Sequence, residues 1–147
     1  MPKTLYILNG PNLNLLGSRE PEIYGSQTLG DIEALCASHA RAAGYSIVFR
    51  QTNIEGELVD YIQEGAAKGV AILINPAAYT HTSVALYDAI KAVNIPVIEV
   101  HLSQPAARED FRQISYVSAA AKATISGMGA QSYILGLDAI FHALKIA

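Results

Sequence analysis

The sequence predicts a doubly wound α/β fold, in which a parallel sheet lies between two layers of helices. Short, continuous apolar runs alternate with longer segments that repeat apolar residues at helical spacing, as expected for strands covered on both faces. The chain has 147 residues, which suits one domain and is too short for the eight βα units of a barrel. We therefore expect a single domain over residues 1–147.

Five strands are expected, one at each short apolar run. They cover residues 5–8, 46–51, 70–74, 96–100 and 124–125. Turn-forming residues end two of them: Asn9-Gly10-Pro11 follows the first strand, and Asn75-Pro76 follows the third. These strands are the expected layer at the centre of the molecule.

Helices are expected between the strands, at residues 28–43, 55–68, 82–93 and 131–146. The first begins with Thr28-x-x-Asp31, the pattern of a capping box, and Gly44 follows its last turn. Strands and helices in this order, joined by right-handed crossovers, give a flavodoxin-like, three-layer sandwich.

Composition narrows the classes of function. Charged residues are only 16% of the chain, against about 25% in typical domains, which predicts that an oligomer covers part of the surface. The net charge is −3 and no basic cluster occurs, so we expect no nucleic-acid partner and no membrane partner. No apolar run reaches the roughly 18 residues of a membrane span, no signal-peptide pattern occurs, and we expect a cytoplasmic protein. Cys36, the single cysteine, is expected to be a buried and inert thiol.

The loop after the first strand is the most unusual connection. It spans residues 9–26, whereas such loops usually have about 2–6 residues. Gly17 and Gly25 bracket Arg19 and Tyr24, so this piece is expected to move as a lid between two hinges. Ligands of this fold class bind at the carboxyl ends of the strands, which is where the loop lies.

The fourth strand ends with Glu99 and His101, which are expected to contact each other because alternate residues of a strand share a face. A carboxylate beside an imidazole fixes its tautomer and favours its protonated form, which suits His101 to donate a proton. The same pair could instead bind a metal. Neither His-x-x-x-His nor Glu-x-x-His spacing occurs, however, so a metal site is not favoured.

The segment after the third strand carries His81, Ser83 and Asp88. These types superficially suggest a hydrolase triad, but Gly-x-Ser-x-Gly is missing and Ser83 suits an N-terminal helix cap. His81 and Asp88 are seven residues apart and would share a helical face if the helix began near His81.

Two arginines and two histidines also allow interpretations that give them no role in a functional site. Arg108 and Arg112 are expected on one helical face, where they suit an anionic or polyhydroxylated ligand, unless they merely pair with Glu109 and Asp110. By contrast, His39 and His142 lie among alanines and leucines, where we expect no polar partner.

Taken together, these segments resemble type II 3-dehydroquinate dehydratase (3-dehydroquinase) over essentially the whole chain. The matching segments are residues 9–17 (Asn-Gly-Pro-Asn-Leu-Asn-Leu-Leu-Gly), Arg19-Glu20-Pro21, Tyr24-Gly25, Gln51-x-Asn53, 74–83, 99–103, 108–112 and Ile125-x-Gly127-x-Gly129. Two positions depart from the pattern: Gln104, where many relatives have Asn, and Gln113, where many have His. These departures leave open only the local packing and the loop after Ser103.

The resemblance implies a cofactor-free and metal-free hydro-lyase of flavodoxin-like fold. Its substrate would be 3-dehydroquinate, converted to 3-dehydroshikimate and water in the shikimate route or its catabolic counterpart. The resemblance also implies a homododecamer built as a tetramer of trimers.

The resemblance further implies roles for individual residues. Tyr24 would take the proton next to the ketone, and Arg19 would stabilise the tyrosinate. Asn12 would stabilise the resulting enolate through a bound water, and His101 would protonate the departing hydroxyl. Asp88 would reach in from a neighbouring subunit. The matched residues that would hold the substrate are Asn75, His81, Asp88, Leu102, Ser103 and Arg112.

Two other functions stay open from the residues alone. A flavodoxin-like module that binds FMN or a nucleotide would need a phosphate-binding first loop, whereas this loop is rich in Asn and Leu. A Schiff-base dehydratase would need a buried lysine at a strand end. The five lysines lie instead at element ends or on helices: Lys3, Lys68, Lys91, Lys122 and Lys145.

Overall fold

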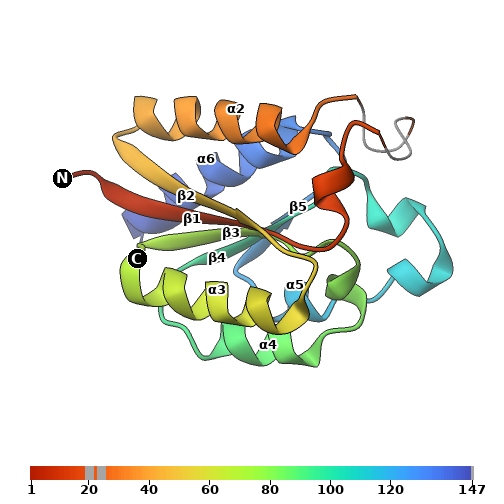
Figure 1. Ribbon diagram of the computed structural model, residues 1–147. Helices are drawn as coiled ribbons and strands as arrows, with labels where there is room; N and C mark the ends of the chain where they lie inside the picture. The colour runs from red at the N-terminus through yellow and green to blue at the C-terminus, as the bar shows by residue number, and fades with distance from the viewer. Residues whose placement is uncertain (19–21, 23–25, 147) are drawn as a thin grey trace.

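The sheet has five parallel strands in the order β2-β1-β3-β4-β5 (Figure 1). The computed structural model describes residues 1–18, 22 and 26–146. The strands are β1 (Lys3–Asn9), β2 (Tyr45–Gln51), β3 (Ala71–Asn75), β4 (Val97–Val100) and β5 (Ala123–Ile125). This is the predicted flavodoxin-like order, and each strand lies within two residues of its expected bounds.

Helices cover both faces of the sheet, as predicted (Figure 1). On one face lie α2 (Leu29–Ala42) and α6 (Gln131–Ile146), and on the other lie α3 (Glu55–Lys68), α4 (Val84–Lys91) and α5 (Tyr116–Ala120). The helix expected at 82–93 is shorter than predicted because a 3-10 turn, η2 (Ala77–His81), precedes it. The five-residue helix α5 was not predicted.

Local capping chemistry explains where two helices begin. Thr28 Oγ1 accepts a hydrogen bond from the Asp31 N–H at 3.1 Å, and the Asp31 carboxylate accepts one from the Thr28 N–H at 3.0 Å. The predicted capping box is therefore confirmed. Ser83 Oγ accepts from the Leu86 N–H at 2.9 Å, so Ser83 is the cap of α4, as expected.

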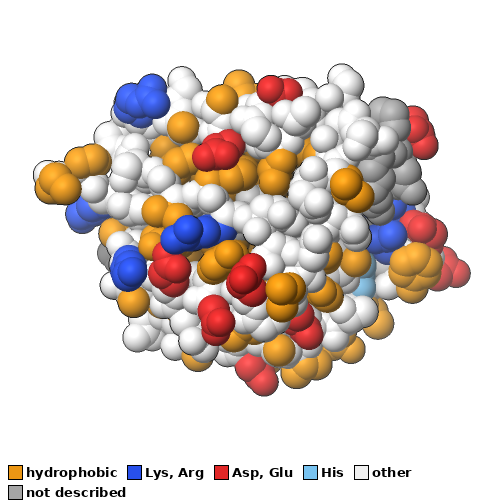
Figure 2. Space-filling model, viewed as in Figure 1, with side chains coloured by type: hydrophobic (Ala, Val, Ile, Leu, Met, Phe, Trp, Pro, Cys, Tyr) orange, Lys and Arg blue, Asp and Glu red, His pale blue; other side chains and the backbone are white. Residues whose placement is uncertain are grey.

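The surface carries few and scattered charges. On the face drawn in Figure 2, acidic and basic side chains are dispersed among many uncharged and hydrophobic ones. Several large hydrophobic side chains are exposed near α4 and α5, with Val84 at 55%, Phe111 at 65% and Ile114 at 61%. Within the described residues, no helix is both long and apolar enough to cross a membrane.

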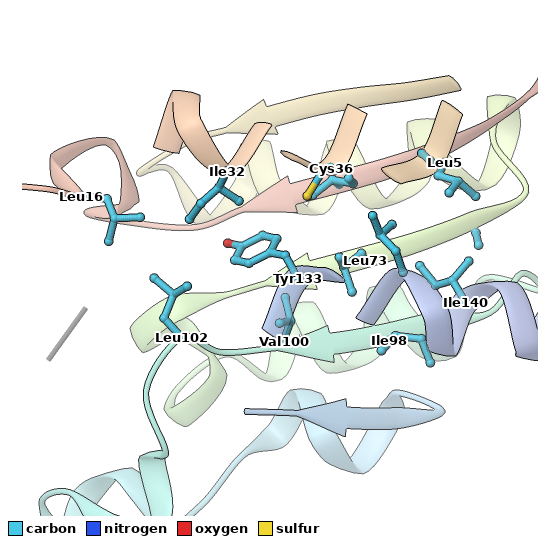
Figure 3. Packing of buried hydrophobic residues seen from close by; sticks show 14 residues of the cluster. Leu5, Leu16, Ile32, Cys36, Leu73, Ile98, Val100, Leu102, Tyr133 and Ile140 are labelled. Carbon is cyan, nitrogen blue, oxygen red and sulfur yellow. The ribbon is translucent and has the colours of Figure 1, made fainter. Parts of the chain in front are cut away.

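Two apolar clusters pack against the sheet, one on each face. In the cluster of Figure 3, Leu5, Leu73 and Ile98 of the strands meet Cys36 of α2 and Tyr133 of α6. Cys36 is fully buried, and burial, followed by the nearby Glu33 carboxylate, raises the pKa of its thiol to about 12. The thiol therefore stays protonated, and the expected burial is confirmed.

His39 has a polar partner, so the expectation that it has none was wrong. Its Nε2 lies 2.7 Å from the Asp138 carboxylate, and its ring stacks on Phe141 with centroids 5.8 Å apart. The contact with Asp138 joins α2 to α6 across 99 positions of sequence, so no local pattern predicts it.

Candidate active site

A cavity opens at the carboxyl edge of the sheet, on the side where the strand arrows point in Figure 1. It encloses about 520 Å³ of empty space, including the part open to solvent. Its polar lining comes from the loops after β1, β3 and β4: Asn12, Asn75, His81, His101, Ser103, Arg108 and Arg112. Leu102 also lines it, so the cavity gathers every predicted site residue except Asp88, Arg19 and Tyr24. Arg19 and Tyr24 lie outside the described residues.

The loops after β1 and β3 lie in close contact at Gly10. A Cβ atom on Gly10 would lie 2.6 Å from the carbonyl oxygen of Pro76, so only glycine fits. The Gly10 N–H donates to the carbonyl of Asn75 at 2.8 Å. Asn12, two residues on, has a left-handed φ of 68°, which asparagine tolerates, and its N–H donates to Asn53 Oδ1 at 2.9 Å. The contact brings Asn12 beside Asn75.

Asn75 is held by partners from two directions. Its Nδ2 donates to the Tyr133 hydroxyl at 2.9 Å, and its Oδ1 accepts from the Ala77 N–H at 3.1 Å. Tyr133 in turn donates to Asn9 Oδ1 at 2.6 Å, and burial raises its pKa, so the phenol keeps its proton. One hydrogen of Asn75 Nδ2 is used inside the protein, and the second can bond to a ligand.

Ala77 is held in an unusual backbone conformation. Its φ is +50°, in the left-handed region that residues with a Cβ rarely adopt. Such conformations cost on the order of 1–3 kcal/mol and concentrate at functional sites. Ala77 lines the cavity and forms the start of the turn that carries His81.

The predicted contact between Glu99 and His101 is present. His101 Nε2 lies 2.5 Å from Glu99 Oε2, and the two side chains are 10% and 0% exposed. Burial alone would raise the pKa of Glu99. Hydrogen bonding and the charge of His101, with hydroxyl donors from Ser118 and Thr80, outweigh burial and lower the pKa to about 2. Glu99 is therefore ionised at neutral pH, and Nδ1 of His101 is the ring nitrogen available to a ligand.

His81 is oriented by a main-chain group. Its Nδ1 lies 2.7 Å from the carbonyl oxygen of Ile114. A carbonyl can only accept, so Nδ1 carries the hydrogen and Nε2 is left as the ligand-facing nitrogen. The two histidines of the cavity thus offer opposite ring nitrogens.

Arg108 and Arg112 line the cavity, but the helix expected to carry both was wrong. They belong to a segment with two 3-10 turns, η3 (Pro105–Ala107) and η4 (Asp110–Arg112). Arg108 Nη1 donates to Ser103 Oγ at 3.2 Å, while Arg112 Nε donates to Glu109 Oε1 at 2.9 Å. The expected pairing with Glu109 is thus present, although both guanidinium side chains still face the cavity.

Asp88 lies away from the other predicted site residues. It is exposed on α4 and does not line the cavity of its own chain. Because α4 begins only at Val84, His81 and Asp88 belong to different elements and do not share a helical face.

The two positions that depart from the family pattern have local partners. Gln104 Oε1 accepts from Ser126 Oγ at 2.5 Å. Gln113 Nε2 donates to the carbonyl oxygens of Glu109 at 3.3 Å and Arg108 at 3.5 Å. Both glutamines therefore tie down the segment around η3 and η4. Among the described residues, no group of three His, Cys, Asp or Glu side chains is arranged to hold a metal ion.

Comparison with known proteins identifies the family. The model of the family described as Dehydroquinase class II matches residues 3–141. The chain belongs to the class II dehydroquinase family. Curated relatives named 3-dehydroquinate dehydratase occur in Maricaulis maris, 56% identical over 98% of this chain and 99% of the relative, and in Phenylobacterium zucineum, 60% identical over 95% and 96%.

Solved dehydroquinase structures share the whole fold. The type II dehydroquinase from Propionibacterium acnes is 42% identical, with a TM-score of 0.91 over 95% of this chain and 97% of that one. The type II dehydroquinase from Butyrivibrio crossotus is 37% identical, with a TM-score of 0.93 over 95% and 98%. The family and the flavodoxin-like fold inferred from the sequence are thereby confirmed.

Proposed function

We propose that the chain dehydrates 3-dehydroquinate to 3-dehydroshikimate, the type II dehydroquinase reaction of the shikimate pathway. The observation that carries this function is the cavity at the carboxyl edge, where the His101–Glu99 pair lies beside amide, imidazole and guanidinium groups in a member of the class II dehydroquinase family. The FMN or nucleotide alternative finds no support among the relatives.

The chemistry requires a base and an acid on the substrate. A C–H bond next to the ketone and a C–O bond break, and a C=C bond forms together with water. No electron is gained or lost overall, so proton transfer and charge stabilisation are sufficient. We therefore propose that the reaction needs no metal and no cofactor.

His101 is the proposed general acid. Glu99 holds the hydrogen on Nε2, so the protonated ring presents its second N–H, at Nδ1, to the departing hydroxyl. Donation from Nδ1 releases the hydroxyl as water.

The proposed base is Tyr24, with Arg19 as its electrostatic partner. Free tyrosine has a pKa of about 10, so a base working near neutral pH needs roughly 1.4 kcal/mol of stabilisation for each unit of lowering. An arginine supplies a permanent positive charge for this purpose. Arg108, on the cavity wall, is proposed to add to the same field.

The other side chains of the cavity suit a hydroxylated, anionic ring. Asn12 is proposed to stabilise the enolate through a bound water. Asn75, His81 and Arg112 can bond ring hydroxyls through the atoms not engaged inside the protein. The substrate carboxylate is proposed to bind at the main chain of Leu102 and Ser103 and at the Ser103 hydroxyl.

The proposed assembly is a homododecamer of four trimers, and the proposed location is the cytoplasm. Exposed apolar side chains, including Val84 on α4 and Phe111 on η4, support burial of part of the surface by another chain. Asp88 lies on the same helix and is proposed to reach the cavity of the neighbouring subunit.

Replacing His101 tests the proposed acid. His101→Ala should lower kcat for 3-dehydroquinate by about 10²–10⁴-fold, the usual contribution of a general acid. The measurement is the steady-state rate of 3-dehydroshikimate formation. His142→Ala, an exposed histidine on α6, is the matched control and should keep full activity. A His101→Ala enzyme with near-normal kcat would exclude His101 as the acid.

A further inference from the structure

We propose that Ser118 and Thr124 are positioning residues for the acid His101, acting through the carboxylate of Glu99. The proposal rests on the dehydratase function described above and adds two residues to which neither the sequence motifs nor the cavity lining gave a role.

The two oxygens of Glu99 have different partners apart from Ser115 Oγ, which lies 3.5 Å from Oε1 and 3.2 Å from Oε2. Oε2 contacts His101 Nε2 and accepts from Thr80 Oγ1, both at 2.5 Å. Oε1 is bound by Ser118 Oγ and by Thr124 Oγ1, the latter at 2.9 Å. One oxygen therefore faces the catalytic imidazole, and the other is held by the pair of hydroxyls.

Holding Oε1 fixes the direction of Oε2. A carboxylate group rotates about the bond to its side chain, and both oxygens turn together. Glu99 is 0% exposed, so its oxygens rely on these protein donors and not on solvent while Ser118 and Thr124 are in place. If the donors at Oε1 are removed, the carboxylate is expected to turn toward other donors and to lose its alignment with His101 Nε2. The imidazole then no longer holds its second N–H on the departing hydroxyl.

The two hydroxyls come from two different elements. Ser118 lies on α5, and Thr124 lies on the edge strand β5. Their hydroxyl oxygens are also 2.9 Å apart, so both lie together at the same oxygen of Glu99. Ser115 supports the arrangement by capping α5, with its hydroxyl 3.0 Å from the Ser118 N–H, and by bonding Glu99 Oε2 at 3.2 Å.

The hydroxyl pair is separate from the substrate cavity. Ser118 and Thr124 line a second cavity of about 470 Å³ of empty space, which shares His81, His101, Pro105 and Arg112 with the first. Neither residue lines the cavity proposed for the substrate. Their loss should therefore change the chemical step and leave substrate binding unchanged. A purely structural role would instead lower the stability of the protein, without lowering kcat at an unchanged KM.

Variants that lack these hydroxyls distinguish a positioning role from a purely structural one. The combination of Ser118→Ala and Thr124→Val removes both donors at nearly constant volume and should lower kcat about tenfold, part of the roughly 10²–10⁴-fold that a general acid supplies. The KM for 3-dehydroquinate should stay within about twofold, because this acid acts in the chemical step and not in binding. Restoring one hydroxyl with Thr124→Ser, in place of Thr124→Val, should recover most of kcat.

Ser126→Ala is the matched control. The Ser126 hydroxyl lines the same second cavity but donates to Gln104, so its loss should leave kcat unchanged. A proton NMR signal for the His101 Nε2–H should move in the double variant and stay in place in Ser126→Ala.

Several outcomes would overturn the proposal. They are an unchanged kcat in the folded double variant, an equal loss in Ser126→Ala, or a loss confined to KM. If the double variant does not fold, the single variants are judged by the same criteria. A wild-type chain that fails to dehydrate 3-dehydroquinate would overturn the proposed function instead, while the NMR signal would still report on the contact with Glu99.

Discussion

At the scale of single residues, the chemistry of the site depends on which atom of each side chain is already engaged. Glu99 hydrogen-bonds to Nε2 of His101, and the Ile114 carbonyl hydrogen-bonds to Nδ1 of His81. Tyr133 uses one hydrogen of Asn75. The remaining atoms face the ligand. The His101 ring can donate a proton, the His81 ring can accept a hydrogen bond from a hydroxyl, and the Asn75 amide has a fixed orientation.

The ionisation of Glu99 should be visible in the stability of the protein. Its pKa is lowered from 4.5 to about 2, so its contribution to stability is present above about pH 4.5 and is lost as the pH falls through about 2. The free energy of unfolding should therefore drop by on the order of 3 kcal/mol across that window. Glu99→Gln should flatten this part of the curve, as measured by urea unfolding at several pH values.

Glu33→Gln, at an exposed position on α2, serves as the control and should follow the wild-type curve. A Glu99→Gln protein with the same pH dependence as the wild type would refute the role given to Glu99 in stability.

Only some of these residue contacts could be predicted from the sequence. Glu99 and His101 are two residues apart on a strand, so their contact follows from strand geometry alone. By contrast, the bond between Tyr133 and Asn75 spans 58 positions, and the bond between Thr124 and Glu99 spans 25. Such partners are adjacent only after the sheet has formed, and no spacing rule identifies them.

At the scale of elements, apolar periodicity and capping predicted most of the fold. The helices at 55–68 and 131–146 match their predicted bounds. Acidic residues in the first turn and Lys68 in the last mark the helix at 55–68, and a long apolar pattern marks the helix at 131–146. The helix α5 was missed because five residues are too few to show a periodic pattern.

The segment between β4 and α5 shows why spacing alone can mislead. Arg108 and Arg112 are four residues apart, which suggests a shared helical face. Arg108 and Glu109 are extended, with ψ of −156° and 152°, and this break ends one 3-10 turn before the next begins. Both arginines lie on this irregular backbone and still line the cavity. The sequence therefore predicted their place at the site but not the element that carries them.

At the scale of the whole molecule, the proposed trimer would complete the site with Asp88. Light scattering should give the mass of twelve chains of 15.7 kDa. Asp88→Ala should raise the KM for 3-dehydroquinate or weaken the assembly, since the side chain is exposed and away from its own cavity. A fully active monomer would contradict a site shared between chains.

The central claim is that this chain eliminates water from 3-dehydroquinate with its own acid and base. The most direct measurement follows the ultraviolet absorbance of the conjugated enone product after 3-dehydroquinate is added to the purified protein, with and without EDTA. We expect the absorbance to rise at the same rate in both samples. Absence of the enone product, or its loss when EDTA is added, would contradict the claim.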